Sequence, residues 1–170
     1  KIQRSRPTGY LTELPVEHRV ETDEFTLLIR GRIDGLLITS ERVLLEEIKT
    51  VSASWDHEAD PLHWAQAKFY GFIHAREHAL KELVIQVVYL ELPAGKVIEF
   101  RQTFSFAELS DFFAATTAEY VAWLRERHHW CLTRDASIAA LAFPFPQYRP
   151  GQRELAVAAY RVLAKGGRLF

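Results

Sequence analysis

The chain has 170 residues, of which 48% are hydrophobic and 12% aromatic, and its formal net charge at pH 7 is −1. This length and composition allow one compact domain with a tail, and they argue against a strongly basic protein that coats nucleic acid. One cysteine rules out an intrachain disulfide and a four-cysteine iron–sulfur cluster. There is no secretory signal pattern and no run of 18 apolar residues, so we expect a cytoplasmic protein with no membrane partner.

The first predicted elements are strands. One covers Val16–Val20, and the next two form a hairpin in which the apolar runs 36–38 and 43–45 flank the polar stretch 39–42. With Ser40 and Glu41 as the turn residues, Asp34 faces Glu47 across the hairpin. Directly opposed positions have Cβ atoms about 4.5–5.5 Å apart, so the two carboxylates can share one divalent cation.

The same hairpin predicts a catalytic face. Side chains alternate along a strand, so Lys49 shares the face of Asp34 and Glu47, while Glu46 and Ile48 point to the other face. Two carboxylates and a lysine suit phosphodiester hydrolysis with Mg²⁺ or Mn²⁺. An alternative is a surface ion-pair ladder with Arg32, and a one-residue shift of register would also remove the site.

A helix is predicted from Asp60, the N-cap, through Pro61 to about Leu80. Gln66 and Tyr70 fall on one face of this helix as an i,i+4 pair, which allows both to reach the predicted site. The ordinary alternative for this pair is a surface amide above a half-buried tyrosine.

Strands are then predicted at Glu82–Leu92 and Val97–Thr103, joined by a turn at 93–96. A capping box at Ser105–Glu108 opens a helix to about Arg127, with an inward face that includes Phe113 and Tyr120. The fold class expected from this order is α/β, with a mixed central β-sheet flanked by helices and a C-terminal helical tail. His128, His129 and Cys131 are a weak zinc signal because no fourth ligand follows at standard spacing.

The C-terminal part begins with a proline-rich break at 143–150, and an amphipathic helix is expected over 151–164. We therefore predict two parts, residues 1–142 and residues 143–170. One interpretation of the second part is a linker followed by a helix that packs on the first part.

The motif Gly31-x-Ile33-Asp34, followed by Glu47-x-Lys49 and Gln66-x-x-x-Tyr70, resembles the RecB-like branch of the PD-(D/E)XK nucleases over roughly residues 1–130. The resemblance implies that Asp34, Glu47 and the carbonyl of Ile48 bind metal and that Lys49 is catalytic. It also implies that Gln66 and Tyr70 line the DNA-facing side. The family often has a further histidine ligand on an earlier helix. His18 does not match that position, so we expect the ligand upstream of Lys1.

The string Tyr148-Arg149-x-x-Gln152, which precedes a helix, is similar to the start of the motor domain in DinG-like superfamily-2 DNA helicases. This resemblance implies that Tyr148, Arg149 and Gln152 belong to a nucleotide site. Because no G-x-x-x-x-G-K-[ST] loop occurs here, ATP would be used only by a longer protein, and we expect that loop downstream of Phe170.

The function expected from these resemblances is a metal-dependent DNA nuclease domain of a helicase–nuclease in DNA repair or processing. Its partners would be DNA, single-stranded or with free ends, and a helicase domain downstream in the same chain. One alternative is a nuclease-fold DNA-binding module with little or no activity, attached to the helicase. A third is a structural α/β domain with an incidental motif.

Overall fold

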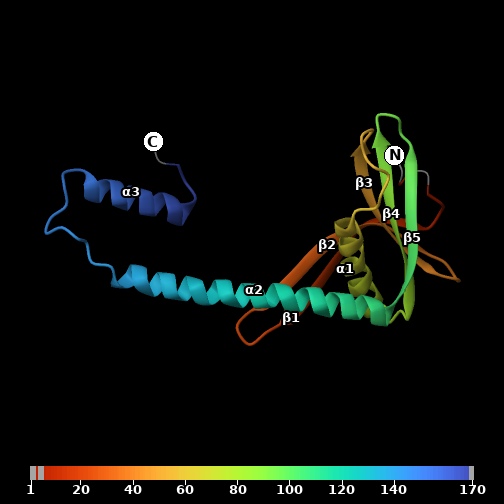
Figure 1. Ribbon diagram of the computed structural model, residues 1–170, viewed down its shortest axis with the longest axis horizontal. Coiled ribbons are helices and arrows are strands. Elements are labelled where there is room, and N and C mark those ends of the chain that lie inside the picture. Colours follow the sequence, from red (N-terminus) through yellow and green to blue (C-terminus); the bar gives the residue numbers. More distant parts are fainter. Residues whose placement is uncertain (1–2, 4–5, 169–170) are drawn as a thin grey trace. The chain divides into compact units, whose positions relative to one another are not determined.

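The computed structural model describes residue 3 and residues 6–168. The predicted fold class is confirmed: the structure is α/β, with a mixed five-stranded sheet, flanking helices and a C-terminal helix (Figure 1). The chain forms two compact units, residues 1–125 and 126–170. The elements are β1 (Tyr10–Glu21), β2 (Thr26–Ile38), β3 (Val43–Ser52), α1 (Pro61–Glu77), β4 (Glu82–Leu92), β5 (Val97–Ser105), α2 (Phe106–Ala140) and α3 (Gln152–Lys165).

The strands lie in the order β1-β2-β3-β4-β5, and only β3 and β4 run parallel. The predicted hairpin register is confirmed from Gly35–Glu46 to Ile38–Val43, with Leu36 opposite Leu45, but the ladder ends before the predicted pair Asp34–Glu47. Thr39 donates its N–H to the carbonyl of Arg42 at 2.9 Å, which closes the predicted turn. Glu46 therefore has paired strands on both sides, β2 and β4, whereas Glu47 is paired with β4 alone.

Helix α1 crosses from β3 to β4, which a parallel strand pair requires. It starts as predicted, because Asp60 Oδ1 accepts the N–H of Leu62 at 2.8 Å and Pro61 occupies the first turn. It ends at Glu77 and not at Leu80. The helix ends there because Ala79 has a left-handed φ of 52°. The N–H of Leu80 then donates to the carbonyl of Ala75 at 2.9 Å.

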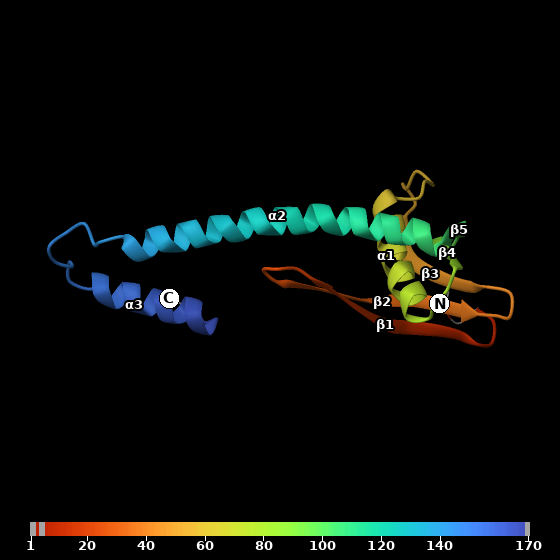
Figure 2. The same ribbon diagram turned by 90° about the horizontal axis from the view of Figure 1, so that it is seen from below.

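Helix α1 and the first part of α2 lie on the same face of the sheet, as Figure 2 shows. Aromatic rings join the two helices: Phe72 stacks on Phe113 with centroids 4.1 Å apart. Gly71 lies close to the sheet, where a Cβ would come within 3.0 Å of Ile85. The buried apolar core is formed mainly between this helical layer and the sheet.

The alternation of buried and exposed residues in β2 changes phase at Asp34. Residues 27, 29, 31 and 33 are inward, but Gly35 and Leu36 are both buried. On β1, Thr12 pairs with Gly35 and Leu14 pairs with Ile33. Glu13, which lies between them, has a positive φ of 56°. At the same place, the regular ladder between β2 and β3 ends at the pair Gly35–Glu46.

Two predictions about α2 were wrong. The capping box is present, because Glu108 Oε2 accepts the N–H of Ser105 at 2.8 Å, but the helix continues past Arg127 to Ala140. No glycine or proline interrupts residues 128–140, so nothing in the backbone stops the helix there. Tyr120 points outward and is 47% exposed, because the buried stripe follows Leu109, Phe113, Thr117 and Val121.

The second unit consists of the end of α2, the proline-containing segment and α3. Helix α3 is bounded by two glycines with positive φ, Gly151 at 79° and Gly166 at 69°. The boundary predicted at 142/143 stays a prediction. Within the described residues, no helix is long and apolar enough to cross a membrane.

Candidate metal and nucleic-acid site

The structure brings Glu47, Lys49 and Asp34 together where β2 and β3 separate. Glu47 is 1% exposed, and its Oε1 lies 2.6 Å from Lys49 Nζ. Its Oε2 is buried and has no hydrogen-bond partner among the described residues. Burial raises the pKa of Glu47; the hydrogen bond from Lys49 opposes this shift, and the negative charge of Asp34 adds to it. A surface ion-pair ladder does not describe so deeply buried a carboxylate.

Asp34 is tied to the backbone of β3. Its Oδ2 accepts the N–H of Ile48 at 2.7 Å. In an extended strand the N–H and carbonyl of one residue point to the same side, so the carbonyl of Ile48 also points toward β2. Asp34, Glu47 and this carbonyl make an all-oxygen donor set of the kind that Mg²⁺ and Mn²⁺ prefer.

The unpartnered Oε2 of Glu47 fits a bound cation, because a buried carboxylate oxygen without a donor is costly. The described residues contain no group of three or more His, Cys, Asp or Glu side chains that could hold a metal. Ligands other than these two carboxylates would therefore be backbone, water or substrate oxygens, or groups outside the described residues.

Helix α1 places Gln66 and Tyr70 at the same site. Lys49 Nζ donates to Gln66 Oε1 at 3.0 Å, and Gln66 Nε2 donates to the Tyr70 hydroxyl at 3.3 Å. The Tyr70 ring occupies the space where a Cβ of residue 31 would be, so any larger residue at Gly31 would have to displace that ring. The predicted motif residues Glu47, Lys49, Gln66 and Tyr70, from β3 and α1, thus form one continuous polar chain.

On the opposite face of β3, Glu46 is the centre of a second polar network that the sequence analysis missed. Its Oε1 lies 2.7 Å from Arg6 Nη2 and accepts Gln86 Nε2 at 2.6 Å. Its Oε2 accepts Arg6 Nε at 3.0 Å and the Tyr10 hydroxyl at 2.5 Å. The Tyr10 ring occupies the position of a Cβ on Gly35. Gly31 and Gly35, before and after Asp34 on β2, thus each make room for a tyrosine ring.

A third group was also missed and lies beside Lys49 on the helix-covered face. Tyr89 is the parallel-ladder partner of Lys49, and its ring stacks on Trp55 with centroids 4.3 Å apart. Its hydroxyl accepts the N–H of Asp60 at 2.9 Å and lies 2.8 Å from His63 Nδ1. The only sequence signal was spacing, because His63 precedes Gln66 by three residues on the helix.

Other residues considered in the sequence lie elsewhere. His18 packs edge-on against Phe72 and Phe113, and Arg32 pairs with Glu13 at 3.4 Å. The predicted nucleotide residues lie in the second unit: Tyr148 stacks on Phe143, with ring centroids 4.2 Å apart. Gln152 Oε1 accepts the N–H of Arg149 at 3.1 Å, so its amide helps to form the turn before α3.

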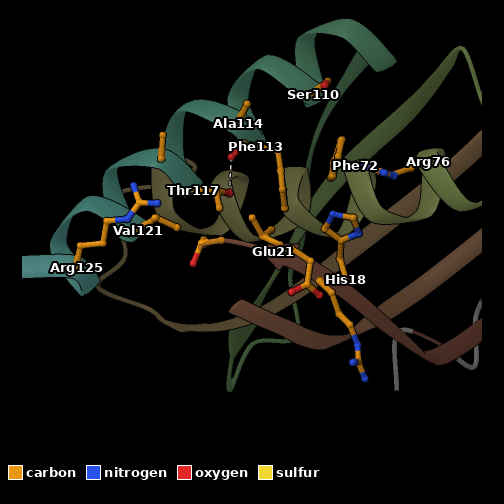
Figure 3. Close-up of a pocket in the computed structure, with 14 residues that line it drawn as sticks. His18, Glu21, Phe72, Arg76, Ser110, Phe113, Ala114, Thr117, Val121 and Arg125 are labelled. Atoms are coloured by element: carbon orange, nitrogen blue, oxygen red, sulfur yellow. Dashed lines mark hydrogen bonds between the residues drawn. The ribbon is translucent and has the colours of Figure 1, made fainter. Parts of the chain in front are cut away.

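A groove of about 570 Å³ lies apart from the proposed metal site, between β1, α1 and the first part of α2. Figure 3 shows its floor, in which Phe72 and Phe113 meet His18, and the side chains of Arg76 and Arg125. Arg125 Nε pairs with Glu24 at 3.2 Å. None of Asp34, Glu47 and Lys49 lines this groove.

The chain matches no protein-family model and no curated protein. Among solved structures it is similar to the crystal structure of SSO0001, with 17% sequence identity and a TM-score of 0.45. The similarity covers 64% of this chain and 50% of SSO0001, so the chain spans about half the length of that protein.

Proposed function

We propose that this chain is a metal-dependent DNA nuclease domain that uses Mg²⁺ or Mn²⁺. The observation that carries the proposal is the buried Oε2 of Glu47, which lacks a partner and lies beside a second carboxylate, Asp34. Buried Glu47 and half-buried Asp34 beside one lysine leave excess negative charge, which a divalent cation would neutralise.

In this proposal Asp34, Glu47 and the carbonyl of Ile48 hold the metal, which when bound lowers the pKa of a water molecule and polarises a phosphate oxygen. Lys49 is the catalytic residue. Glu47 and Gln66 both hold its ammonium, which leaves one N–H free to orient the attacking water or to offset negative charge on the phosphate. Gln66 and Tyr70 lie next to Lys49 and would contact DNA.

The substrate and the wider protein follow from the resemblances in the sequence. The substrate would be DNA, single-stranded or with free ends. A helicase domain downstream of Phe170 would use ATP through residues that include Tyr148, Arg149 and Gln152, and the whole protein would couple unwinding to cutting in DNA repair.

Substitution of the site tests the proposal. We expect Asp34→Ala and Lys49→Ala each to reduce Mn²⁺-dependent cleavage of a labelled single-stranded oligonucleotide by about 100-fold or more, because the first removes a proposed metal ligand and the second the proposed catalytic ammonium. Exposed residues of the same types supply matched controls, Asp23→Ala and Lys96→Ala. Full activity of both site variants would contradict the assignment.

The second candidate function is a DNA-binding module without catalysis. It is favoured because the described residues contain no third His, Cys, Asp or Glu side chain placed to hold a metal together with Asp34 and Glu47. Calorimetric titration with Mn²⁺ separates the two candidates. A nuclease site should bind the ion in a manner that Asp34→Ala abolishes, and a binding module need not bind it.

A further inference from the structure

His63 belongs to the same face of α1 as Gln66 and Tyr70. It precedes them by three and seven residues, and these spacings place side chains on one side of a helix. Its ring lies against Tyr89, with centroids 5.6 Å apart, and Tyr89 is the ladder partner of Lys49. The imidazole is thus next to the lysine of the proposed site.

The hydrogen bonds of Tyr89 allow His63 to carry its proton on Nε2. The Tyr89 hydroxyl already accepts the N–H of Asp60, so its single proton is available for His63 Nδ1 at 2.8 Å. Burial lowers the pKa of His63, and the positive charge of Lys49 lowers it further. In the neutral ring whose Nδ1 accepts the Tyr89 proton, the imidazole proton is on Nε2.

The Nε2–H group is free to bind a ligand. Among the described residues no group pairs with it, and the only buried side-chain atom found without a partner is Glu47 Oε2, so Nε2 is open to solvent. A neutral imidazole cannot donate a proton to a leaving group as readily as an imidazolium, but it is a good hydrogen-bond donor to an anion.

We infer that His63 is a substrate-binding residue, which donates a hydrogen bond from Nε2 to a phosphate oxygen of the nucleic acid beside Lys49. This inference rests on the proposed nuclease function. It adds a phosphate contact to that site, and it assigns the Tyr89 hydroxyl and the Asp60 backbone as the groups that orient the imidazole.

Two amide substitutions distinguish a substrate contact from a structural role. In His63→Gln the side-chain amide reaches the position of Nε2, and in His63→Asn it reaches that of Nδ1. We expect His63→Ala and His63→Asn to raise KM for a single-stranded oligonucleotide about tenfold, with kcat little changed, because a hydrogen bond to a charged group is lost. His63→Gln should keep KM within about threefold of the original value. His78→Ala, an exposed histidine at the other end of α1, is the matched control.

The outcomes are distinct. If His63→Asn behaves like the original chain while His63→Gln behaves like His63→Ala, the residue acts only through Tyr89 and the inference is overturned. Three variants with unchanged KM would also overturn it, while the proposed function would stand. No cleavage by the unsubstituted chain with either Mg²⁺ or Mn²⁺ would overturn the proposed function itself, and this inference with it.

Discussion

Glu46 and Glu47 follow one another on β3, and each is 1% exposed, yet their carboxylates have opposite environments. Both oxygens of Glu46 are fully bonded, by Arg6, Tyr10 and Gln86. Glu47 has one partner, Lys49, and a buried oxygen with none. A buried charge that is fully paired supports the fold, whereas one left incompletely paired marks a place where a ligand completes the site. We therefore infer that Glu46 stabilises the fold on one face of β3, and that Glu47 belongs to the candidate functional site on the other face.

The largest effect expected on stability concerns Glu46. Glu46→Ala leaves Arg6, Tyr10 and Gln86 without their shared acceptor, and we expect the free energy of unfolding to fall by about 3 kcal/mol. Urea denaturation followed by circular dichroism measures this change. A loss no greater than that of a surface substitution would show that the network contributes little, and the contrast between the two faces would fail.

The next effect should come from metal binding at Glu47. At a Mg²⁺ or Mn²⁺ concentration 100 times Kd, we expect the original chain to gain about 2.7 kcal/mol in the free energy of unfolding. Thermal denaturation with and without the ion provides the test. Glu47→Ala should remove the gain and Glu46→Ala should retain it; an equal gain in both variants would place the ion elsewhere.

Gly35 tests how closely Tyr10 covers the back of the site. A Cβ at this position would overlap the Tyr10 ring, so Gly35→Ala should cost about 2 kcal/mol through overpacking. In a Tyr10→Ala background the same glycine substitution should cost much less, and a double-mutant cycle measures the coupling. Equal costs in both backgrounds would mean that the ring moves aside.

The smallest effect is the pH dependence that Glu47 contributes. Its pKa is raised in the folded state above the ordinary value of 4.5, mainly by burial, so the folded chain prefers the protonated form. Stability from this group is present below pH 4.5 and is lost as pH rises through the folded pKa. Glu47→Gln should therefore gain stability relative to the original chain as pH rises, when both are measured without metal. A difference that is constant with pH would contradict the shifted pKa.

Local rules were enough for much of the fold and for the first choice of site residues. The hairpin register follows from its turn, and the starts of α1 and α2 follow from capping at Asp60 and Ser105, since each depends on residues only a few positions apart. Alternation along a strand separated Glu46 from Glu47 without any tertiary information. The i,i+4 spacing likewise paired Gln66 with Tyr70.

The length of α2 and the direction of Tyr120 could not be predicted in this way. A helix without a breaker continues until the backbone is interrupted, and which side of it is buried depends on what lies beneath it. The structure shows that only the stripe through Phe113, Thr117 and Val121 is buried.

By itself the sequence determined the strand and helix order and the hairpin register, because these follow from short-range periodicity and turn chemistry, and it selected Asp34, Glu47 and Lys49 as candidate site residues. Only the tertiary structure decided that Glu46 is saturated by Arg6 and Gln86, that Tyr10 and Tyr70 fill the spaces above two glycines, and that Tyr89 orients His63. Those contacts join residues up to 40 positions apart, such as Arg6 and Glu46. The packing of whole strands and helices determines which residues make these contacts, and a short-range sequence pattern does not predict that packing.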